Sequence, residues 1–167
     1  SVRLLKSVPE LANLASRVRM KPCWAVMAAF DSRLPATFDA AFVHDSPLSW
    51  VARNSSKPAR SRSHDCWVLH ASADWSHDHV EAELEEVKTR LLQEFWNTTG
   101  GRSVPPAVVM AHRWRYALPV DPLEDGCLFH AVSGLGACGD WCSGPRVEGA
   151  FLSGSAAAGR ILREFED

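Results

Sequence analysis

The sequence predicts an α+β fold built on a largely antiparallel sheet. Short apolar runs typical of strands follow one another without the regular strand–helix alternation that a parallel sheet requires. One segment, residues 76–97, instead has apolar residues spaced near 3.6 and predicts a long helix covering the sheet. A chain of 167 residues with 46% hydrophobic residues is long enough to bury such a core.

The predicted strands are short segments rich in apolar residues and bounded by turn residues. They are residues 23–30, 41–44, 48–53, 66–71, 108–118, 127–131 and 135–138. Asp45-Ser46-Pro47 has turn chemistry, so 41–44 and 48–53 are expected to form a hairpin or meander.

Three helices are predicted. Residues 9–18 place Leu11, Leu14, Ala15 and Val18 on one face, with Pro9 in the first turn. In 76–97, Ser76 is a plausible N-cap and Gly100 follows the end. The apolar stripe of this helix consists of Val80, Leu84, Val87, Leu91 and Phe95. A third helix begins near Glu148 or Gly149.

Charge and cysteine content exclude several classes of protein. The net charge of −2 shows no basic surplus for nucleic acid, and no apolar run is long enough to insert in a membrane. Five cysteines, an odd number, favour reduced thiols and an intracellular location, in the cytoplasm or an organelle. Cys138 and Cys142 are a weak candidate for zinc, and no metal site is predicted.

Two groups of residues have both a functional and a structural interpretation. Arg53, Lys57, Arg60 and Arg62 form a basic cluster, which either contacts phosphate of a dinucleotide substrate or belongs to a solvated loop. Four tryptophans in strand-like runs either fill the core or line a pocket for a flat aromatic ligand. They are Trp24, Trp50, Trp67 and Trp114.

The segment 134–159 is rich in glycine and other small residues. Gly139-Asp140 ends a predicted strand, and the following helix opens with small residues that allow close approach of a backbone or a flat ligand. This arrangement suits a flavin, with Asp140 toward its ribityl or phosphate part and the helix N-terminus toward the ring. A strand–loop–helix packed on its own sheet explains the pattern equally well.

Several motifs make the chain similar to flavin-containing amine oxidases, and more narrowly to their renalase-type branch. The C-terminal ones are Gly139-Asp140, Val147-Glu148-Gly149-Ala150, and Ser153-Gly154 followed by Ala156-Ala157. The others are Lys21-Pro22-Cys23-Trp24-Ala25, Trp50-Val51-Ala52-Arg53-Asn54-Ser55-Ser56-Lys57-Pro58, Cys66-Trp67-Val68-Leu69-His70-Ala71-Ser72 and His112-Arg113-Trp114-Arg115-Tyr116-Ala117.

The resemblance implies a substrate-binding domain at 1–132 and the C-terminal segment of an FAD-binding domain at 133–167. It implies that FAD takes a hydride from an amine or a reduced nicotinamide isomer and passes electrons to oxygen. The expected FAD contacts are Gly139, Asp140, Glu148, Gly149, Ala150 and Phe151. Those expected to face a small-molecule substrate are Trp67, His70, Trp114 and Tyr116, with core packing as the alternative, and no catalytic residue is assigned.

Members of this family begin with a dinucleotide-binding βαβ unit whose Gly-x-Gly-x-x-Gly turn binds the FAD pyrophosphate. We interpret Gly134-Leu135-Gly136 as lacking the third glycine at the required distance, so the sequence predicts that this unit is absent. The 167 residues are therefore expected not to be a self-sufficient oxidase. Their partner would be the missing FAD-binding half or another protein chain, and a non-catalytic binding or scaffold role is the alternative. In that case Ala150, Ser153, Gly154 and Ala157 would form an exposed face of the last helix.

Overall fold

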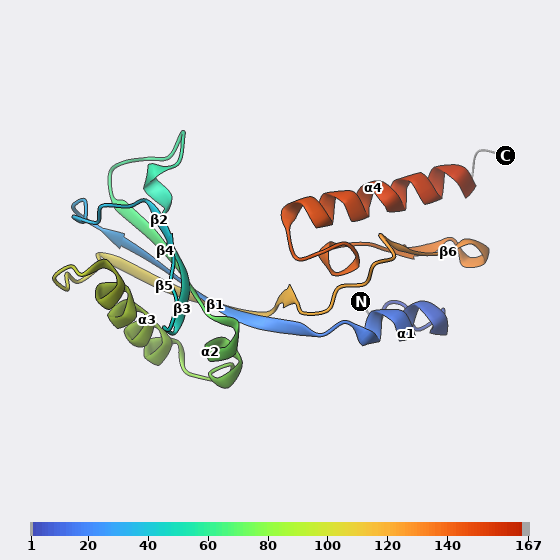
Figure 1. The fold of residues 1–167 in the computed structure, drawn as a ribbon, viewed down its shortest axis with the longest axis horizontal. Helices are drawn as coiled ribbons and strands as arrows, with labels where there is room; N and C mark the ends of the chain where they lie inside the picture. The colour runs from blue at the N-terminus through green and yellow to red at the C-terminus, as the bar shows by residue number, and fades with distance from the viewer. Residues whose placement is uncertain (1, 165–167) are drawn as a thin grey trace. The chain divides into compact units, whose positions relative to one another are not determined.

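The computed structural model describes residues 2–164, which divide into two compact units (Figure 1). The first, called the sheet unit, is Pro22–Arg115. The second, called the terminal unit, combines Ser1–Lys21 with Tyr116–Asp167. Residues 116–132, which the sequence analysis assigned to the substrate-binding domain, thus belong to the same compact unit as the C-terminal helix.

A five-stranded sheet with the order β2-β3-β4-β1-β5 forms the sheet unit. The β1–β4, β2–β3 and β3–β4 pairs are antiparallel, which confirms the predicted α+β class. In the order of the sheet, the strands are β2 (Ala40–Phe42), β3 (Leu48–Arg53), β4 (Asp65–Ala71), β1 (Met20–Phe30) and β5 (Val108–Pro119). Each overlaps a predicted strand, although β2 includes only residues 41 and 42 of the predicted 41–44, and β2 and β3 form the expected hairpin.

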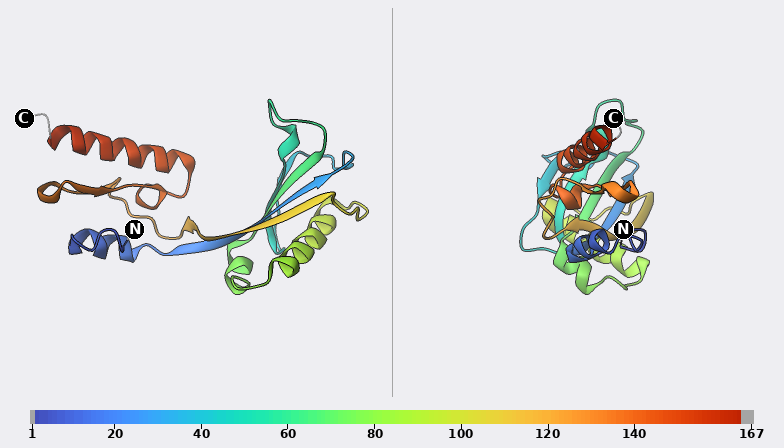
Figure 2. Two further views of the ribbon diagram at one scale, coloured as in Figure 1. Left: turned by 180° about the vertical axis from the view of Figure 1, so that it is seen from behind. Right: turned by 90° about the vertical axis from the view of Figure 1, so that its right-hand side faces the viewer.

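One face of this sheet is buried under helix α3 (Leu84–Thr99) (Figures 1 and 2). Directly paired residues of neighbouring strands share a face, and the pairs Val26–Leu69 and Ala28–Trp67 point into the core. From the helix, Val87, Leu91 and Phe95 are fully buried against them. Three of the five stripe residues therefore cover the sheet as predicted.

The prediction of one continuous helix over 76–97 is wrong. The segment contains α2 (Ala73–Asp78), a turn, and α3, which begins only at Leu84. Ser72, not Ser76, caps α2 by accepting a hydrogen bond from the Trp75 amide. Leu84 is 50% exposed, so the apolar stripe does not continue through the turn.

Tertiary hydrogen bonds explain why the helix stops. Buried Ser76 accepts a bond from the Trp24 amide at 3.0 Å instead of capping a helix. The indole Nε1 of Trp24 donates to the His79 carbonyl at 2.9 Å, and Arg113 donates to the Val80 carbonyl. Carbonyls at 79 and 80 thus bond to side chains from β1 and β5, and the chain turns there.

The terminal unit has its own small core. Helix α1 (Pro9–Arg17) contributes Leu11 and Ala15, as the predicted helix over 9–18 requires. Strands β6 (Leu128–His130) and β7 (Leu135–Ala137) pair antiparallel, and α4 (Val147–Glu164) follows. The unit also contains the short 3-10 helices η2 (Ala131–Ser133) and η3 (Asp140–Cys142), and the sheet unit contains η1 (Asn54–Ser56). Within residues 2–164, no helix is both long and apolar enough to cross a membrane.

Arg53 lies in the core of the sheet unit, which contradicts both interpretations of the basic cluster for this residue. Its side chain is fully buried, with Nε 3.3 Å from Asp65 Oδ1 and Nη1 3.3 Å from Asp39 Oδ1. Its Nη2 donates to the Leu34 carbonyl at 3.0 Å, and the guanidinium lies 4.8 Å from the centre of the Trp67 ring. The sequence placed Arg53 with loop residues because it ends a strand next to them.

Asp65 is the matching buried acid. Its oxygens accept hydrogen bonds from the Leu34 amide at 2.9 Å, the Ser55 hydroxyl at 3.1 Å and the Trp67 indole at 3.1 Å. The Arg53–Asp65 pair therefore joins β3, β4 and the loop after β1 through charge-assisted bonds.

Breaking this pair should destabilise the sheet unit strongly. Arg53→Met leaves Asp65 buried without its cation, and we expect a loss of about 3–5 kcal/mol in the free energy of unfolding. Urea unfolding followed by tryptophan fluorescence measures this loss. The exposed Arg17→Met is the control and should change the free energy by under about 0.5 kcal/mol. Equal effects of the two substitutions would contradict the assignment of Arg53 and Asp65 as a stabilising buried ion pair.

Candidate functional site

The face of the sheet opposite α3, called the open face, is a continuous apolar and aromatic surface. Its first cross-strand row runs through Phe42, Trp50, His70 and Ala25, each directly paired with the next. A second row runs through Ala40, Ala52, Val68 and Met27. No member of either row carries a carboxylate, a guanidinium or an ammonium group.

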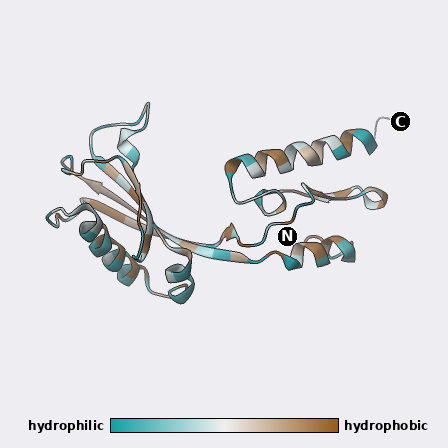
Figure 3. Ribbon diagram, viewed as in Figure 1, coloured by the Kyte–Doolittle hydropathy of each residue, from teal (hydrophilic) through white to brown (hydrophobic). Residues whose placement is uncertain are grey.

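Strand β5 extends the open face at the edge of the sheet. Val109 and Ala111 pack against the core, so the alternate residues of the strand point the other way. Met110 is 57% exposed and Trp114 is 55% exposed. The rings of His112 and Trp114 lie edge to face with centroids 4.4 Å apart. In Figure 3 the strands of the sheet are mainly hydrophobic in colour.

His70 is the titratable group in the middle of the first row. It is half-buried, and burial lowers its pKa from the ordinary value because desolvation penalises the charged imidazolium. The ring is therefore neutral near pH 7, where one nitrogen can donate and the other accept a hydrogen bond. Cys23 is also partly buried, and burial raises the pKa of its thiol, so it is protonated near pH 7.

Two of the four expected substrate residues, His70 and Trp114, lie on the open face. Trp67 does not: it is 1% exposed and packs against Phe95 in the core, which is the alternative that the sequence left open. Tyr116 belongs to the terminal unit, where it is 78% exposed and lines a cavity of about 430 Å³.

The sequence analysis did not assign Phe42 to a site and considered Trp50 only among the tryptophans. The alternation of side chains along each strand could have predicted them. Once the hairpin is aligned, Phe42 pairs directly with Trp50, and Trp50 with His70, so all three share one face.

The lowered pKa of His70 predicts a pH-dependent stability. Below about pH 6.5 the unfolded chain takes up a proton that native His70 does not, so the free energy of unfolding falls as the pH decreases toward the native pKa. Urea unfolding at several pH values, compared with His70→Phe, measures this contribution. We expect the variant to lose less stability over this interval than the wild type. Identical slopes for the two proteins would contradict the prediction.

In the terminal unit, Gly139 and Asp140 lie at the end of the β6–β7 hairpin. Gly139 has φ +153°, and its amide donates to Ser153 Oγ at 2.9 Å. The main-chain carbonyl of Asp140 accepts bonds from the amides of Ser143 and Gly144. Its carboxylate is half-buried and makes no hydrogen bond or ion pair with any group of residues 2–164. That carboxylate is available to accept hydrogen bonds from hydroxyl groups.

The start of α4 differs from the expected flavin contacts at two residues. The Ala150 amide donates to the Arg146 carbonyl at 3.1 Å, so it is not free for a ligand. Gly149 is buried against the chain itself, because a Cβ there would lie 2.2 Å from the Gly144 carbonyl oxygen. Glu148 and Phe151 are exposed, and the amides of residues 147–149 have no partner one turn earlier in the helix.

The face expected to be exposed on α4 is wrong for Ser153, which packs inward. Ser153 is fully buried and donates to the Gly126 carbonyl at 2.5 Å. A Cβ at Gly126 would lie 3.6 Å from that of Ala156. Of the four residues expected on that face, only Ala150 is exposed, while Gly154 and Ala157 are half-buried.

Two glycines of α4 provide a matched test of this packing. Gly149→Ala places a methyl group into the Gly144 backbone and should lower the free energy of unfolding by about 1–3 kcal/mol. Gly154→Ala has open space around the new carbon and should raise it by about 0.5–1 kcal/mol through helix propensity. Thermal unfolding followed by circular dichroism compares the two. Equal shifts in the melting temperature would contradict the inward packing of Gly149.

Gly134, Gly136 and Gly139 do have the spacing Gly-x-Gly-x-x-Gly, so the prediction overlooked the third glycine. The structural context nevertheless differs from a dinucleotide-binding turn. Gly134 is the left-handed cap of η2, and Gly136 lies inside β7, which pairs antiparallel with β6. A phosphate-binding turn instead joins a strand directly to the N-terminus of a helix in a βαβ unit.

The cysteines of the terminal unit give no support to a zinc site. Cys142 is buried, and burial raises the pKa of its thiol to about 11. Cys138 is exposed. Among residues 2–164, no group of three or more potential protein ligands could hold a metal ion.

Several solved structures contain a similar fold, although no family model matches the sequence. The chain is similar to a protein assigned as a protoporphyrinogen oxidase from Exiguobacterium sp. 255-15, with a TM-score of 0.75 and 16% identity over 99% of this chain and 39% of that one. It is similar to cyclohexylamine oxidase from Brevibacterium oxydans IH-35A, with a TM-score of 0.65 and 16% identity over 93% of this chain and 38% of that one.

A putrescine oxidase mutant with redesigned cofactor binding also matches, with a TM-score of 0.59 and 14% identity over 90% of this chain and 37% of that one. The chain thus has the fold of one part of these oxidases. It spans less than two fifths of their length.

Proposed function

We propose that this chain is the substrate-binding part, together with the closing hairpin and helix of the cofactor-binding part, of an FAD-dependent oxidoreductase. The observation that carries the proposal is the open face, an apolar and aromatic surface on the side of the sheet opposite α3, with a neutral histidine at its centre. Similarity in fold to oxidases supports the assignment to this class.

The open face would bind the substrate by excluding water and by stacking. Trp50 and Trp114 offer ring faces to a flat substrate, and such aromatic contacts add about 0.5–1.5 kcal/mol beyond area burial. Neutral His70 can hydrogen-bond an uncharged polar group without the cost of desolvating a charge. These residues would orient the substrate, and the flavin, when bound, supplies the hydride acceptor.

The residues at the end of the β6–β7 hairpin fit the polar part of a flavin cofactor. The half-buried carboxylate of Asp140, which lacks a protein partner within residues 2–164, would accept hydrogen bonds from hydroxyl groups of the ribityl chain. Amides in the first turn of α4 would stabilise negative charge on the cofactor. Gly149 and Ala150 would contribute less than expected, because the first packs on Gly144 and the second donates to Arg146.

The phosphates of FAD would need a further segment. Gly134, Gly136 and Gly139 belong to the hairpin and its flanking turns, not to a strand-to-helix turn that binds pyrophosphate. We therefore propose that tight FAD binding requires a dinucleotide-binding unit, in the same polypeptide or in a partner chain.

Within this class, we propose a renalase-like reaction with a reduced nicotinamide isomer as the hydride donor, and an amine as the second candidate. The two central rows of the open face contain no carboxylate to pair with an ammonium group. Their uncharged aromatic surface suits a neutral heteroaromatic ring better than a cationic amine.

A non-catalytic binding or scaffold role is the alternative function. Helix α4 exposes large apolar residues, with Val147 91% exposed, Phe151 71% exposed and Leu162 60% exposed. Exposed apolar residues along a helix mark a surface that another protein segment can cover. The missing cofactor-binding half would cover it in an oxidase, and an unrelated partner would do so in a scaffold.

The first test is whether the protein carries flavin. We expect the tagged protein, purified from its native source, to be yellow and to release FAD on denaturation, identified by mass spectrometry. We expect the isolated 167-residue chain to leave FAD fluorescence unquenched at submicromolar concentrations, because residues 2–164 form no pyrophosphate-binding turn. Asp140→Asn should lower the FAD content of the native preparation, with Glu124→Gln as the control at an exposed acid.

Two outcomes would contradict the proposal. A colourless native preparation without FAD would exclude the oxidoreductase and leave the scaffold role. Submicromolar quenching by the isolated chain would show that it holds the cofactor without a further segment.

A further inference from the structure

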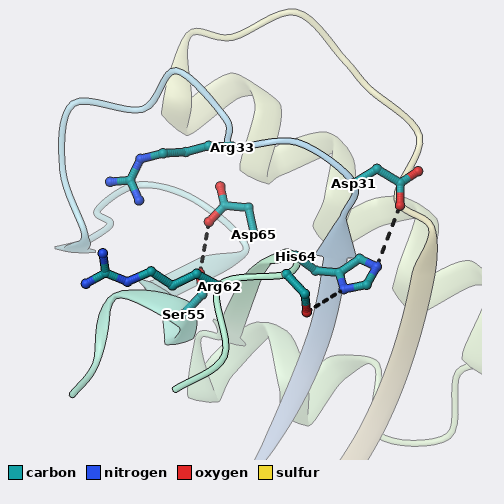
Figure 4. Close-up of a pocket in the computed structure, with 7 residues that line it drawn as sticks. Asp31, Arg33, Ser55, Arg62, His64 and Asp65 are labelled. Atoms are coloured by element: carbon teal, nitrogen blue, oxygen red, sulfur yellow. Dashed lines mark hydrogen bonds and ion pairs between the residues drawn. The ribbon is translucent and has the colours of Figure 1, made fainter. Parts of the chain in front are cut away.

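A second cavity, of about 240 Å³, lies in the sheet unit at the ends of β1 and β4 (Figure 4). It is lined by residues 31 and 33 after β1, by Ser55 in η1, and by residues 62–65, which lead into β4. We propose that this cavity, called the arginine pocket, binds a phosphate group of a soluble small molecule between the guanidinium groups of Arg33 and Arg62. This goes beyond the proposed oxidoreductase activity and does not depend on it.

The two arginines are placed to share one anion. Figure 4 shows both side chains extended toward the same side of the pocket, away from Asp31 and His64. Arg62 makes no ion pair with any residue of the described part of the chain. Arg33 has only a long contact, with Nη2 3.6 Å from Asp39 Oδ1. Both guanidinium groups therefore retain donors for a ligand.

The acidic residues of the pocket do not cancel this charge. Asp65, at its floor, is compensated by buried Arg53 and accepts bonds from Ser55 and the Leu34 amide. Asp31 lies near His64 instead, with Oδ1 3.8 Å from the ring Nε2. Lys57 and Arg60, in the same loop as Arg62, add further positive charge.

Phosphate is the ligand chemistry that this arrangement fits. The planar fork of an arginine matches two oxygens of a phosphate group, and a pair of forks can hold three or four. The cavity has room for the phosphate and part of the group attached to it. The exposed carboxylate of Asp39 next to Arg33, and that of Asp31 near His64 on the other side of the pocket, disfavour an extended anionic surface such as a membrane and favour a single phosphate group.

The test is a calorimetric titration of the chain with inorganic pyrophosphate and with a nucleoside diphosphate. We expect both to bind, and each of Arg33→Ala and Arg62→Ala to weaken the binding about tenfold or more, because each substitution removes charge-assisted hydrogen bonds to the phosphate. Arg160→Ala, on the exposed surface of α4, is the control and should leave the affinity unchanged. Binding should weaken with added salt.

Both substituted arginines are at the surface, and unchanged melting temperatures would establish that the variants are folded. The proposal is overturned if neither phosphate compound binds the wild-type chain, or if both variants bind like the wild type. Binding to phosphatidylglycerol vesicles without binding to pyrophosphate would also overturn it. None of these measurements involves flavin, so they succeed or fail independently of the oxidoreductase proposal.

Discussion

The sheet unit depends on the buried ion pair between Arg53 and Asp65. A guanidinium and a carboxylate without access to water are tolerated only when paired and hydrogen-bonded. Here the Leu34 amide, the Ser55 hydroxyl and the Trp67 indole donate hydrogen bonds to Asp65, and Arg53 donates to the Leu34 carbonyl. Because the pair connects β3, β4 and the loop after β1, it fixes the register that separates the core face from the open face. The same register aligns Phe42, Trp50 and His70 in one row.

How far the sequence predicts this structure depends on whether a feature is local. The strands were predicted because β-branched and aromatic runs bounded by turns need only local chemistry. The break between α2 and α3 was missed because it is made by Trp24 and Arg113, which are distant in sequence. The burial of Arg53 was missed for the same reason, since its acid lies twelve residues further along, on the next strand.

Prediction of the candidate site likewise succeeds for local features and fails for features that depend on strand pairing. His70 and Trp114 were identified by resemblance and do lie on the open face, whereas Trp67, in the same strand as His70, points to the core. Strand alternation separates these two residues: an odd difference in number along one strand means opposite faces. A resemblance in sequence identifies the segment, and only the register identifies which side chains of that segment can reach a ligand.

The small residues of α4 illustrate how one pattern can serve either a ligand or the protein itself. Gly149 and Ser153 suggested close approach of a flavin. In the structure, Gly149 packs against the Gly144 backbone and Ser153 donates to the Gly126 carbonyl, both in the same unit. What remains for a ligand is the carboxylate of Asp140 and the first-turn amides, which together suit hydroxyl groups and delocalised negative charge. The Asp140 carboxylate and these few amides do not provide the set of converging amides that binds a pyrophosphate. Under the proposed function, the terminal unit would therefore provide contacts for only part of FAD, and the affinity for the whole cofactor would come from a segment that binds its phosphates.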